Sequence, residues 1–111
     1  MATLSLAENE KEGLDELIAF LRSSWPLSRF IVFGSKAKGT ADEESDIDLL
    51  IKLPCAVSED IRRTIILKVF DINLRYESNL SVFIVSEDEW QRGVISVLPI
   101  HDFIEEEGIP L

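Results

Sequence analysis

Cysteine and histidine are scarce in this sequence of 111 residues. Cys55 is its only cysteine and His101 is its only histidine. One thiol cannot form an internal disulfide, and a zinc site needs several thiols or imidazoles close together. The sequence therefore excludes a disulfide framework and a zinc centre as the basis of its fold or function.

Positive charge is also in short supply. The chain has 11 lysines and arginines against 21 aspartates and glutamates, which gives a formal net charge of −10. Non-specific attraction to a nucleic-acid backbone depends on basic side chains, and no basic track is visible here. We therefore expect no nucleic-acid partner.

Long apolar runs are absent as well. No stretch approaches the length of a membrane span, and the first residues lack the charged-then-apolar pattern of an export signal. We expect a cytoplasmic protein without a membrane partner. The length fits one domain over residues 1–111, with one core and no room for a second module that binds an acceptor.

Apolar residues recur at helical spacing in two long segments and form short continuous runs in three others. Pro26 ends the first helix, and a capping box begins at Ser86. The expected elements are a helix over 7–25, strands over 30–33 and 46–52, a helix over 58–77, a strand over 80–85, a helix from 86 to Pro99, and a helical turn over 100–107 that ends at a left-handed Gly108.

This order predicts an α/β (α+β) fold in which helices pack on a small sheet of mixed strand directions. The helix over 58–77 has a broad apolar surface that includes Leu67, Phe70 and Leu74. Such a surface either lies across the sheet or contributes to a subunit interface, so a homo-oligomer stays open as an alternative.

The most informative stretch joins the first two strands. The first strand ends at Gly34-Ser35, ten residues follow, and the second strand opens with Asp46-Ile47-Asp48. Side chains alternate in a strand, so the two aspartates should share one face while Ile47 packs on the other. Two carboxylates that close repel each other unless a cation lies between them, and Mg²⁺ suits an open pair of oxygen ligands.

The Gly34-Ser35 turn offers the complementary half of a nucleotide site. A glycine lets backbone N–H groups approach phosphate oxygens, and the serine hydroxyl adds a donor. Lys36 and Lys38 follow, and the segment from Gly34 to Lys38 is expected to begin a short helix whose N-terminus faces the phosphates. An exposed acidic loop is expected over 40–45. A nucleoside triphosphate with its metal fits these parts best.

At these residues the chain resembles the DNA polymerase β-like nucleotidyltransferase superfamily, and within it the minimal nucleotidyltransferases. The signature is an apolar strand, Gly34-Ser35, a short spacer, and Asp46-Ile47-Asp48 on the next strand. The segments Ala37-Lys38-Gly39 and Ser45-Asp46 and the ending over 99–111 are also similar to that family. The resemblance implies the nucleotidyltransferase fold.

The resemblance also implies roles for individual residues. Asp46 and Asp48 would be the catalytic ligands of Mg²⁺, and Gly34 and Ser35 would bind the phosphates of ATP. Lys36 and Lys38 stand where the family commonly has arginines, and they keep the charge but lose the guanidinium fork. The usual partner of such a protein is a small helical HEPN-domain protein, to which it acts as antitoxin.

One expected group is missing. The family has a third carboxylate on or just before a later strand, and here Asn79 and Ser81 occupy that region by parity. Two interpretations follow. The chain either transfers a nucleotide, AMP from MgATP, to a hydroxyl of a protein or small molecule, or it is a nucleotide-binding regulatory subunit of a HEPN complex with impaired catalysis.

Overall fold

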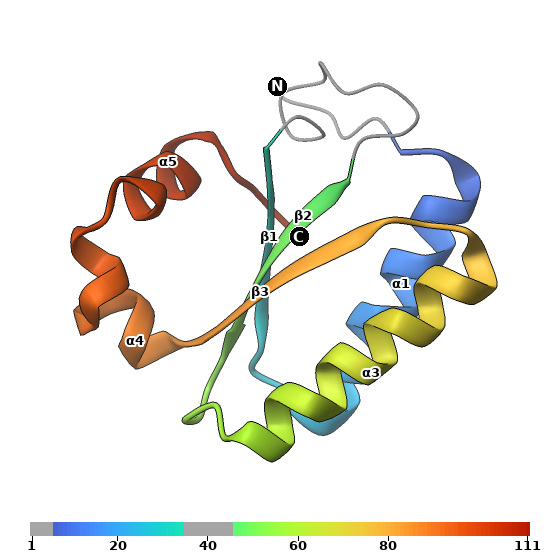
Figure 1. Cartoon of the computed structure of the whole chain (residues 1–111). Coiled ribbons are helices and arrows are strands. Elements are labelled where there is room, and N and C mark those ends of the chain that lie inside the picture. Colours follow the sequence, from blue (N-terminus) through green and yellow to red (C-terminus); the bar gives the residue numbers. More distant parts are fainter. Residues whose placement is uncertain (1–5, 35–45) are drawn as a thin grey trace.

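The computed structural model describes residues 6–34 and 46–111, which form a four-stranded sheet with helices on both faces (Figure 1). The mixed α/β architecture expected from the sequence is confirmed. The elements in chain order are α1 (Glu8–Ser24), β1 (Arg29–Phe33), β2 (Ile47–Leu53), α3 (Glu59–Tyr76), β3 (Leu80–Ser86), α4 (Glu87–Arg92), the 3-10 helix η1 (Val94–Val97), α5 (Pro99–Glu107) and β4 (Ile109–Pro110).

The strands of the sheet run in both directions. Their order is β3-β2-β1-β4, with β1 antiparallel to both β2 and β4, and β2 parallel to β3. The parallel pair is joined through α3, which provides the long crossover that parallel strands require. In this register Asp48 of β2 lies opposite Phe33 of β1 on one side and Ser81 of β3 on the other.

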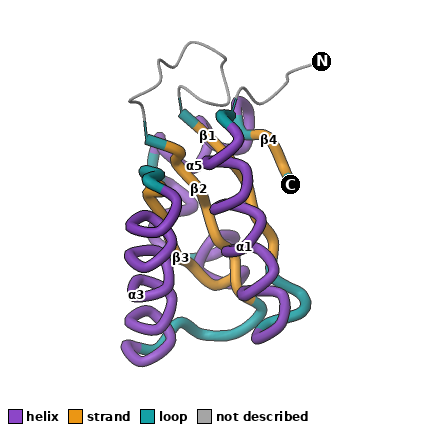
Figure 2. Tube along the Cα trace, turned by 90° about the vertical axis from the view of Figure 1, so that its right-hand side faces the viewer, coloured by secondary structure: helices purple, strands orange, loops and turns teal. Residues whose placement is uncertain are grey.

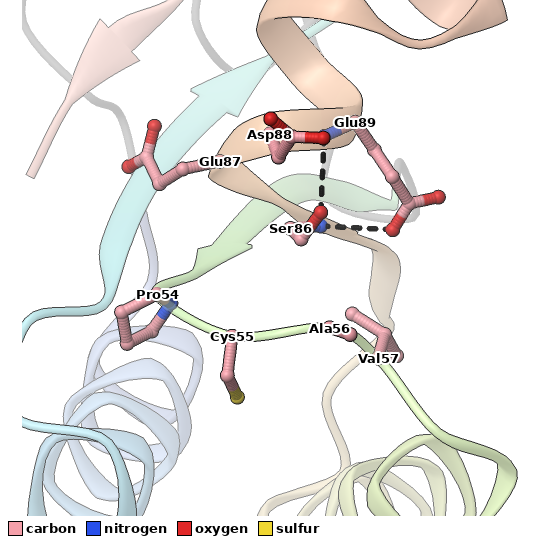
Figure 3. A pocket seen from close by; sticks show the side chains of 8 residues that line it. All are labelled: Pro54, Cys55, Ala56, Val57, Ser86, Glu87, Asp88 and Glu89. Carbon is pink, nitrogen blue, oxygen red and sulfur yellow. Dashed lines mark hydrogen bonds between the residues drawn. The ribbon is translucent and has the colours of Figure 1, made fainter.

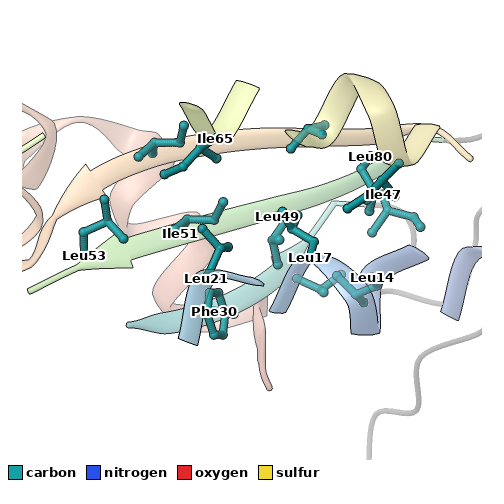
Figure 4. Packing of buried hydrophobic residues seen from close by; sticks show 14 residues of the cluster. Leu14, Leu17, Leu21, Phe30, Ile47, Leu49, Ile51, Leu53, Ile65 and Leu80 are labelled. Carbon is teal, nitrogen blue, oxygen red and sulfur yellow. The ribbon is translucent and has the colours of Figure 1, made fainter. Parts of the chain in front are cut away.

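One face of the sheet is covered by α1 and α3, which lie side by side (Figure 2). Leu17 and Leu21 of α1 and Ile65 of α3 are buried against Leu49 and other strand residues (Figure 4). These leucines recur every three or four residues, which gives the helix one apolar stripe. The cluster on this face is the larger of the two hydrophobic cores.

Side-chain hydrogen bonds cap the start of α3 and tie its last turns to β3. The hydroxyl of Ser58 accepts a hydrogen bond from the Ile61 N–H at 3.1 Å. At the other end, the Asn73 amide oxygen accepts from the Leu80 N–H at 2.9 Å, and the Asn73 amide nitrogen donates to the Leu80 carbonyl at 3.1 Å. These paired bonds tie the end of α3 to the start of β3 and so help to set the register of that strand.

The other face is covered by α4, η1 and α5. Two predictions made from the sequence of this region are wrong. The helix from Ser86 does not continue to Pro99, because α4 ends at Arg92 and Gly93 separates it from η1. Gly108 is not left-handed, since its φ is −72°. A Cβ at Gly108 would come within 2.4 Å of Ile31 Cγ2, so close packing against β1 is the reason for a glycine there.

Strand β4 was not expected from the sequence. It is only two residues long and pairs with β1 at Ile31 and Val32. Within residues 6–34 and 46–111, no helix has the length and apolar character needed to cross a membrane.

Candidate functional site

Asp48 lies near the start of β2, with its side chain on the sheet face that carries α4 and α5. Its neighbours Ile47 and Leu49 are buried on the opposite face, in the core under α1 and α3. Asp48 itself is half-buried. The alternation expected from the Asp-x-Asp pattern is therefore present, and Asp46, immediately before the strand, is exposed.

Gly34 follows β1 and lies directly against the Asp48 carboxylate. Its φ is +78°, in the left-handed region that side chains disfavour. A Cβ at this position would stand 2.4 Å from Asp48 Oδ2, well inside van der Waals contact. Only glycine therefore lets the backbone turn here while the carboxylate stays in place.

The electrostatics of this corner favour a cation. Burial raises the pKa of the Asp48 carboxyl above its ordinary value, and the negative charge of Asp46 raises it further. A divalent ion between the two carboxylates would remove this penalty. Mg²⁺ is commonly held by one or two carboxylates together with water and substrate phosphates, so this pair fits it.

Among residues 6–34 and 46–111, no third carboxylate joins Asp46 and Asp48 in a metal-binding group. In the part of the chain that the structure describes, no three or more histidine, cysteine, aspartate or glutamate side chains are grouped as a metal site. Mg²⁺ held by two carboxylates commonly completes its coordination with water and substrate phosphate oxygens.

The neighbouring strand offers hydroxyl and amide groups where an acid was expected. Ser81 is the register partner of Asp48 and is exposed on the same face. Asn79 directly precedes β3, and its backbone carbonyl accepts the Ile47 N–H at 2.9 Å. Ser81 is thus placed beside Asp48, and Asn79 stands one step further along, level with Asp46. Neither side chain can act as a base near neutral pH.

Several predicted site residues lie outside the described part of the chain. The structure does not describe Ser35, Lys36 and Lys38. The short helix expected from Gly34 to Lys38 and the acidic loop expected over 40–45 also fall outside the described residues. Their predicted contacts with phosphate stay predictions.

A cluster around Trp90 joins α4 to α5 on the sheet face that carries Asp48. Trp90 of α4 is buried, and its ring centroid lies 4.3 Å from that of His101 on α5. The Trp90 indole N–H also donates to the Glu105 carboxylate. These contacts join two helices across η1, and no local spacing in the sequence indicates them.

A separate hollow of about 450 Å³ lies at the other end of the sheet, where β2 and β3 end (Figure 3). Glu87, Asp88 and Glu89 line it, and the Ser86 hydroxyl and N–H are already bonded to Glu89 within the capping box. Three carboxylates at one hollow would repel a polyphosphate. This hollow is therefore not the nucleotide site, and the corner formed by Gly34 and Asp48 is the better candidate.

The sequence matches a known domain family over most of its length. The nucleotidyltransferase domain family matches residues 14–108, which span both strands and both aspartates. No protein of curated function matches the sequence.

Three solved structures share the fold. A toxin–antitoxin structure with AMP-PNP has a TM-score of 0.60 at 15% identity, covering 94% of this chain and 72% of the other. A candidate minimal nucleotidyltransferase has a TM-score of 0.55 at 23% identity, covering 96% and 99%. A candidate nucleotidyltransferase from Sulfolobus solfataricus has a TM-score of 0.50 at 19% identity, covering 97% and 90%.

Because these identities are below 25%, the solved structures show only the fold. The family match covers most of the sequence and includes Asp46 and Asp48. The chain therefore belongs to the nucleotidyltransferase domain family.

Proposed function

We propose that this domain transfers AMP from MgATP to a hydroxyl group of a protein or small-molecule acceptor. The observation that carries the proposal is that the Asp48 carboxylate lies so close to the Gly34 turn that a Cβ at position 34 would stand 2.4 Å from Oδ2, with Asp46 beside it. A glycine turn can present backbone N–H groups to phosphates, and the paired carboxylates can hold the cation that accompanies them. The AMP-PNP in the structurally similar toxin–antitoxin supports an adenine nucleotide.

Each residue has a defined task in this reaction. Asp46 and Asp48 would hold Mg²⁺, and Gly34 with Ser35 would bind phosphate oxygens, with Lys36 and Lys38 adding positive charge. The bound metal would neutralise charge that develops on the phosphate oxygens and orient the reacting groups. The half-buried position of Asp48 keeps part of the site away from water, which strengthens these electrostatic contacts.

The proposed step is an in-line displacement at the α-phosphorus. The acceptor oxygen forms a bond to this phosphorus, the bond to the bridging oxygen of the β-phosphate breaks, and pyrophosphate leaves. The hydroxyl proton passes to water, because Ser81 and Asn79 offer no base beside the carboxylates. Positioning and charge neutralisation would then supply most of the rate enhancement.

The hydroxyl side chain of Ser81 beside Asp48 favours a second candidate function. A hydroxyl at Ser81, where the resembled family has an acid nearby, suits a subunit that binds the nucleotide but turns it over poorly. In that case the domain would regulate a partner, for which a small helical HEPN-domain protein is the proposed identity. The toxin–antitoxin among the similar structures supports a protein partner of this kind.

Transfer of radiolabel from α-labelled ATP, with Mg²⁺ and with co-expressed partner protein, tests the first candidate. We expect label on the partner or on a small acceptor, and loss of at least about 100-fold in rate for Asp48→Asn, which removes a metal ligand. Asp88→Asn, at an exposed acid that lines the hollow at the opposite end of the sheet, is the matched control and should keep full activity.

The variant Ser81→Asp separates the two candidates. If the wild type binds MgATP without transfer and Ser81→Asp gains transfer, the second candidate is correct. If the wild type transfers label and Ser81→Asp changes the rate only a few-fold, the first is correct. Neither candidate survives if MgATP leaves the NMR signals of Gly34, Asp46 and Asp48 unchanged.

A further inference from the structure

A hollow with basic side chains lies at the end of the sheet opposite the corner that holds Asp48. Its volume is about 410 Å³, and its lining includes Arg22 of α1, Arg29 at the start of β1 and Lys52 near the end of β2. Arg29 and Lys52 are register partners on neighbouring strands. Among the described residues, no aspartate or glutamate lines this basic hollow.

Lys52 is a buried member of this lining. The residue is only 8% exposed, and none of the described carboxylates, including that of the last residue, Leu111, forms an ion pair with it. Its ammonium nitrogen lies 5.9 Å from the centre of the Trp90 ring, a contact that attracts a cation but supplies no opposite charge. A buried charge is costly unless it is paired, so an anion in the hollow would stabilise Lys52.

The two arginines add exposed positive charge to the same hollow. The Arg22 guanidinium packs over the Phe30 ring at 5.2 Å, and no described carboxylate forms an ion pair with it. Arg29 has the Glu87 carboxylate 3.5 Å from its Nε, which offsets part of its charge. Guanidinium groups can bind phosphate through paired N–H donors, and an ammonium group adds a compact charge.

The rest of the lining is apolar except for Ser28, and it consists of Phe30, Ile31, Pro110 and Leu111. Small-molecule sites typically combine apolar walls with a few charged groups. A phosphate monoester carries nearly two negative charges at neutral pH, which suits more than one cation. We propose that the basic hollow binds a small phosphate monoester, with its phosphate at Lys52 and its organic part against the apolar walls.

This site is separate from the candidate nucleotide corner. Lys52 follows Asp48 by four residues on β2, which places the two about 13 Å apart along the strand. The monoester and MgATP would therefore bind without competing. The net charge of −10 opposes the approach of any anion, so we expect weak binding, with a dissociation constant of about 1 mM that rises with ionic strength.

An NMR titration with phenyl phosphate, without Mg²⁺ and at constant ionic strength, tests the proposal. The backbone signals of Arg29, Phe30 and Lys52 should shift, and that of Gly34 should not. Inorganic phosphate should bind at the same residues about tenfold more weakly, because it has no apolar part to cover the walls. Shifts at Gly34 without shifts at Lys52 would overturn the proposal, and equal binding of the two probes would overturn the role given to the apolar walls.

Lys52→Met tests the buried charge, because methionine keeps much of the side-chain length and lacks the ammonium group. This variant should weaken phenyl phosphate binding at least about tenfold, and Arg22→Gln should weaken it about threefold. Arg63→Gln, which removes an exposed charge on α3, is the matched control and should bind like the wild type. Unchanged binding by Lys52→Met would overturn the proposal.

Circular dichroism melting gives a second measurement on the same proteins. Without the ligand, Lys52→Met should melt no lower than the wild type, because it removes a buried charge that has no carboxylate partner. Phenyl phosphate should raise the melting temperature of the wild type and of Arg63→Gln, and should leave that of Lys52→Met unchanged. A Lys52→Met protein that melts far below the wild type would show that Lys52 serves the fold, which counts against the proposal.

Discussion

The two faces of the sheet are covered very differently. Under α1 and α3, 14 buried residues form one continuous cluster. Under α4, η1 and α5, the buried apolar cluster has four members among the described residues, and half-buried side chains such as Phe33 and Phe83 surround them. Strand β2 contributes to both clusters, with Leu49 on the first face and Leu50 on the second.

The face under α1 and α3 contributes most of the stability, and the other face carries the candidate catalytic side chains. The first face has continuous apolar packing, which gives it most of the stabilising burial. The second face is incompletely covered where Asp48 and Ser81 lie, and so it leaves polar side chains accessible to a ligand. Candidate catalytic groups thus lie on the less buried face of a strand whose other face belongs to the main core.

The largest expected effect comes from adjacent core residues on the two faces. Leu49→Ala should lower the free energy of unfolding by about 4 kcal/mol, because its dense surroundings cannot collapse into the cavity. Leu50→Ala should cost about 2.5 kcal/mol, since half-buried neighbours can relax. Both leucines are fully buried in the wild type, so urea unfolding of the two variants compares the faces directly. An equal or larger loss for Leu50→Ala would contradict the difference.

A smaller effect is expected at the turn beside the site. Gly34→Ala should lower the free energy of unfolding by about 2 kcal/mol, from a left-handed backbone and from a Cβ placed against Asp48. In an Asp48→Ala background the second cause disappears, so the loss should fall to about 1 kcal/mol. Urea unfolding of the four proteins in this cycle gives the coupling. Additive losses would mean that the Cβ added by Gly34→Ala does not clash with the Asp48 carboxylate.

Much of this architecture could be predicted from the sequence because its signals are local. The stripe that includes Leu14, Leu17 and Leu21 and the capping residue Ser58 indicate α1 and α3, and short apolar runs indicate three strands. The position of Gly34 against Asp48 agrees with the strand–turn–strand pattern. Here local sequence and tertiary structure impose the same conformation.

The missed features depend on distant contacts. Strand β4 has two residues, one of them Pro110, and it exists because β1 offers an edge to pair with. Gly108 is required by the approach of Ile31, from a strand far away in the sequence. Parity alone could not separate Asn79 from Ser81, because only the pairing of β2 with β3 places Ser81 beside Asp48. Gly93 was a local signal for the end of α4 that the apolar run after it obscured.

An ion-pair network on the first face should make a modest, pH-dependent contribution. The Arg75 guanidinium and the Tyr76 hydroxyl bond to Glu16 and lower its pKa to about 2, with Lys68 3.2 Å away. Glu16→Gln should cost at most about 1 kcal/mol at neutral pH, because the network is partly exposed.

The lowered pKa fixes the sign of the pH dependence. The contribution of Glu16 is present above its ordinary pKa of 4.5 and is lost as the pH falls towards about 2. The difference between wild type and Glu16→Gln, measured by urea unfolding, should therefore vanish over this range. Glu12→Gln, an exposed neighbour on α1, is the control and should change stability little at any pH. A difference that persists at about pH 2 would rule out the network as its source.

The smallest effect should have the opposite sign and come from the second face. Burial and the charge of Asp46 raise the pKa of Asp48, so its ionised form opposes folding. This penalty is absent below the ordinary carboxyl pKa of 3.8, grows as the pH rises from there to the raised value, and stays constant above it. Asp48→Asn should therefore have a slightly higher melting temperature than the wild type at neutral pH and the same melting temperature in acid. Asp15→Asn, on the exposed surface of α1, should show no such trend.

Because a cation bound to both carboxylates cancels the penalty, added Mg²⁺ should raise the melting temperature of the wild type and not that of Asp48→Asn. If Asp48→Asn melts below the wild type without Mg²⁺, the carboxylate stabilises the fold, and the site face is not the one where stability is given up for binding.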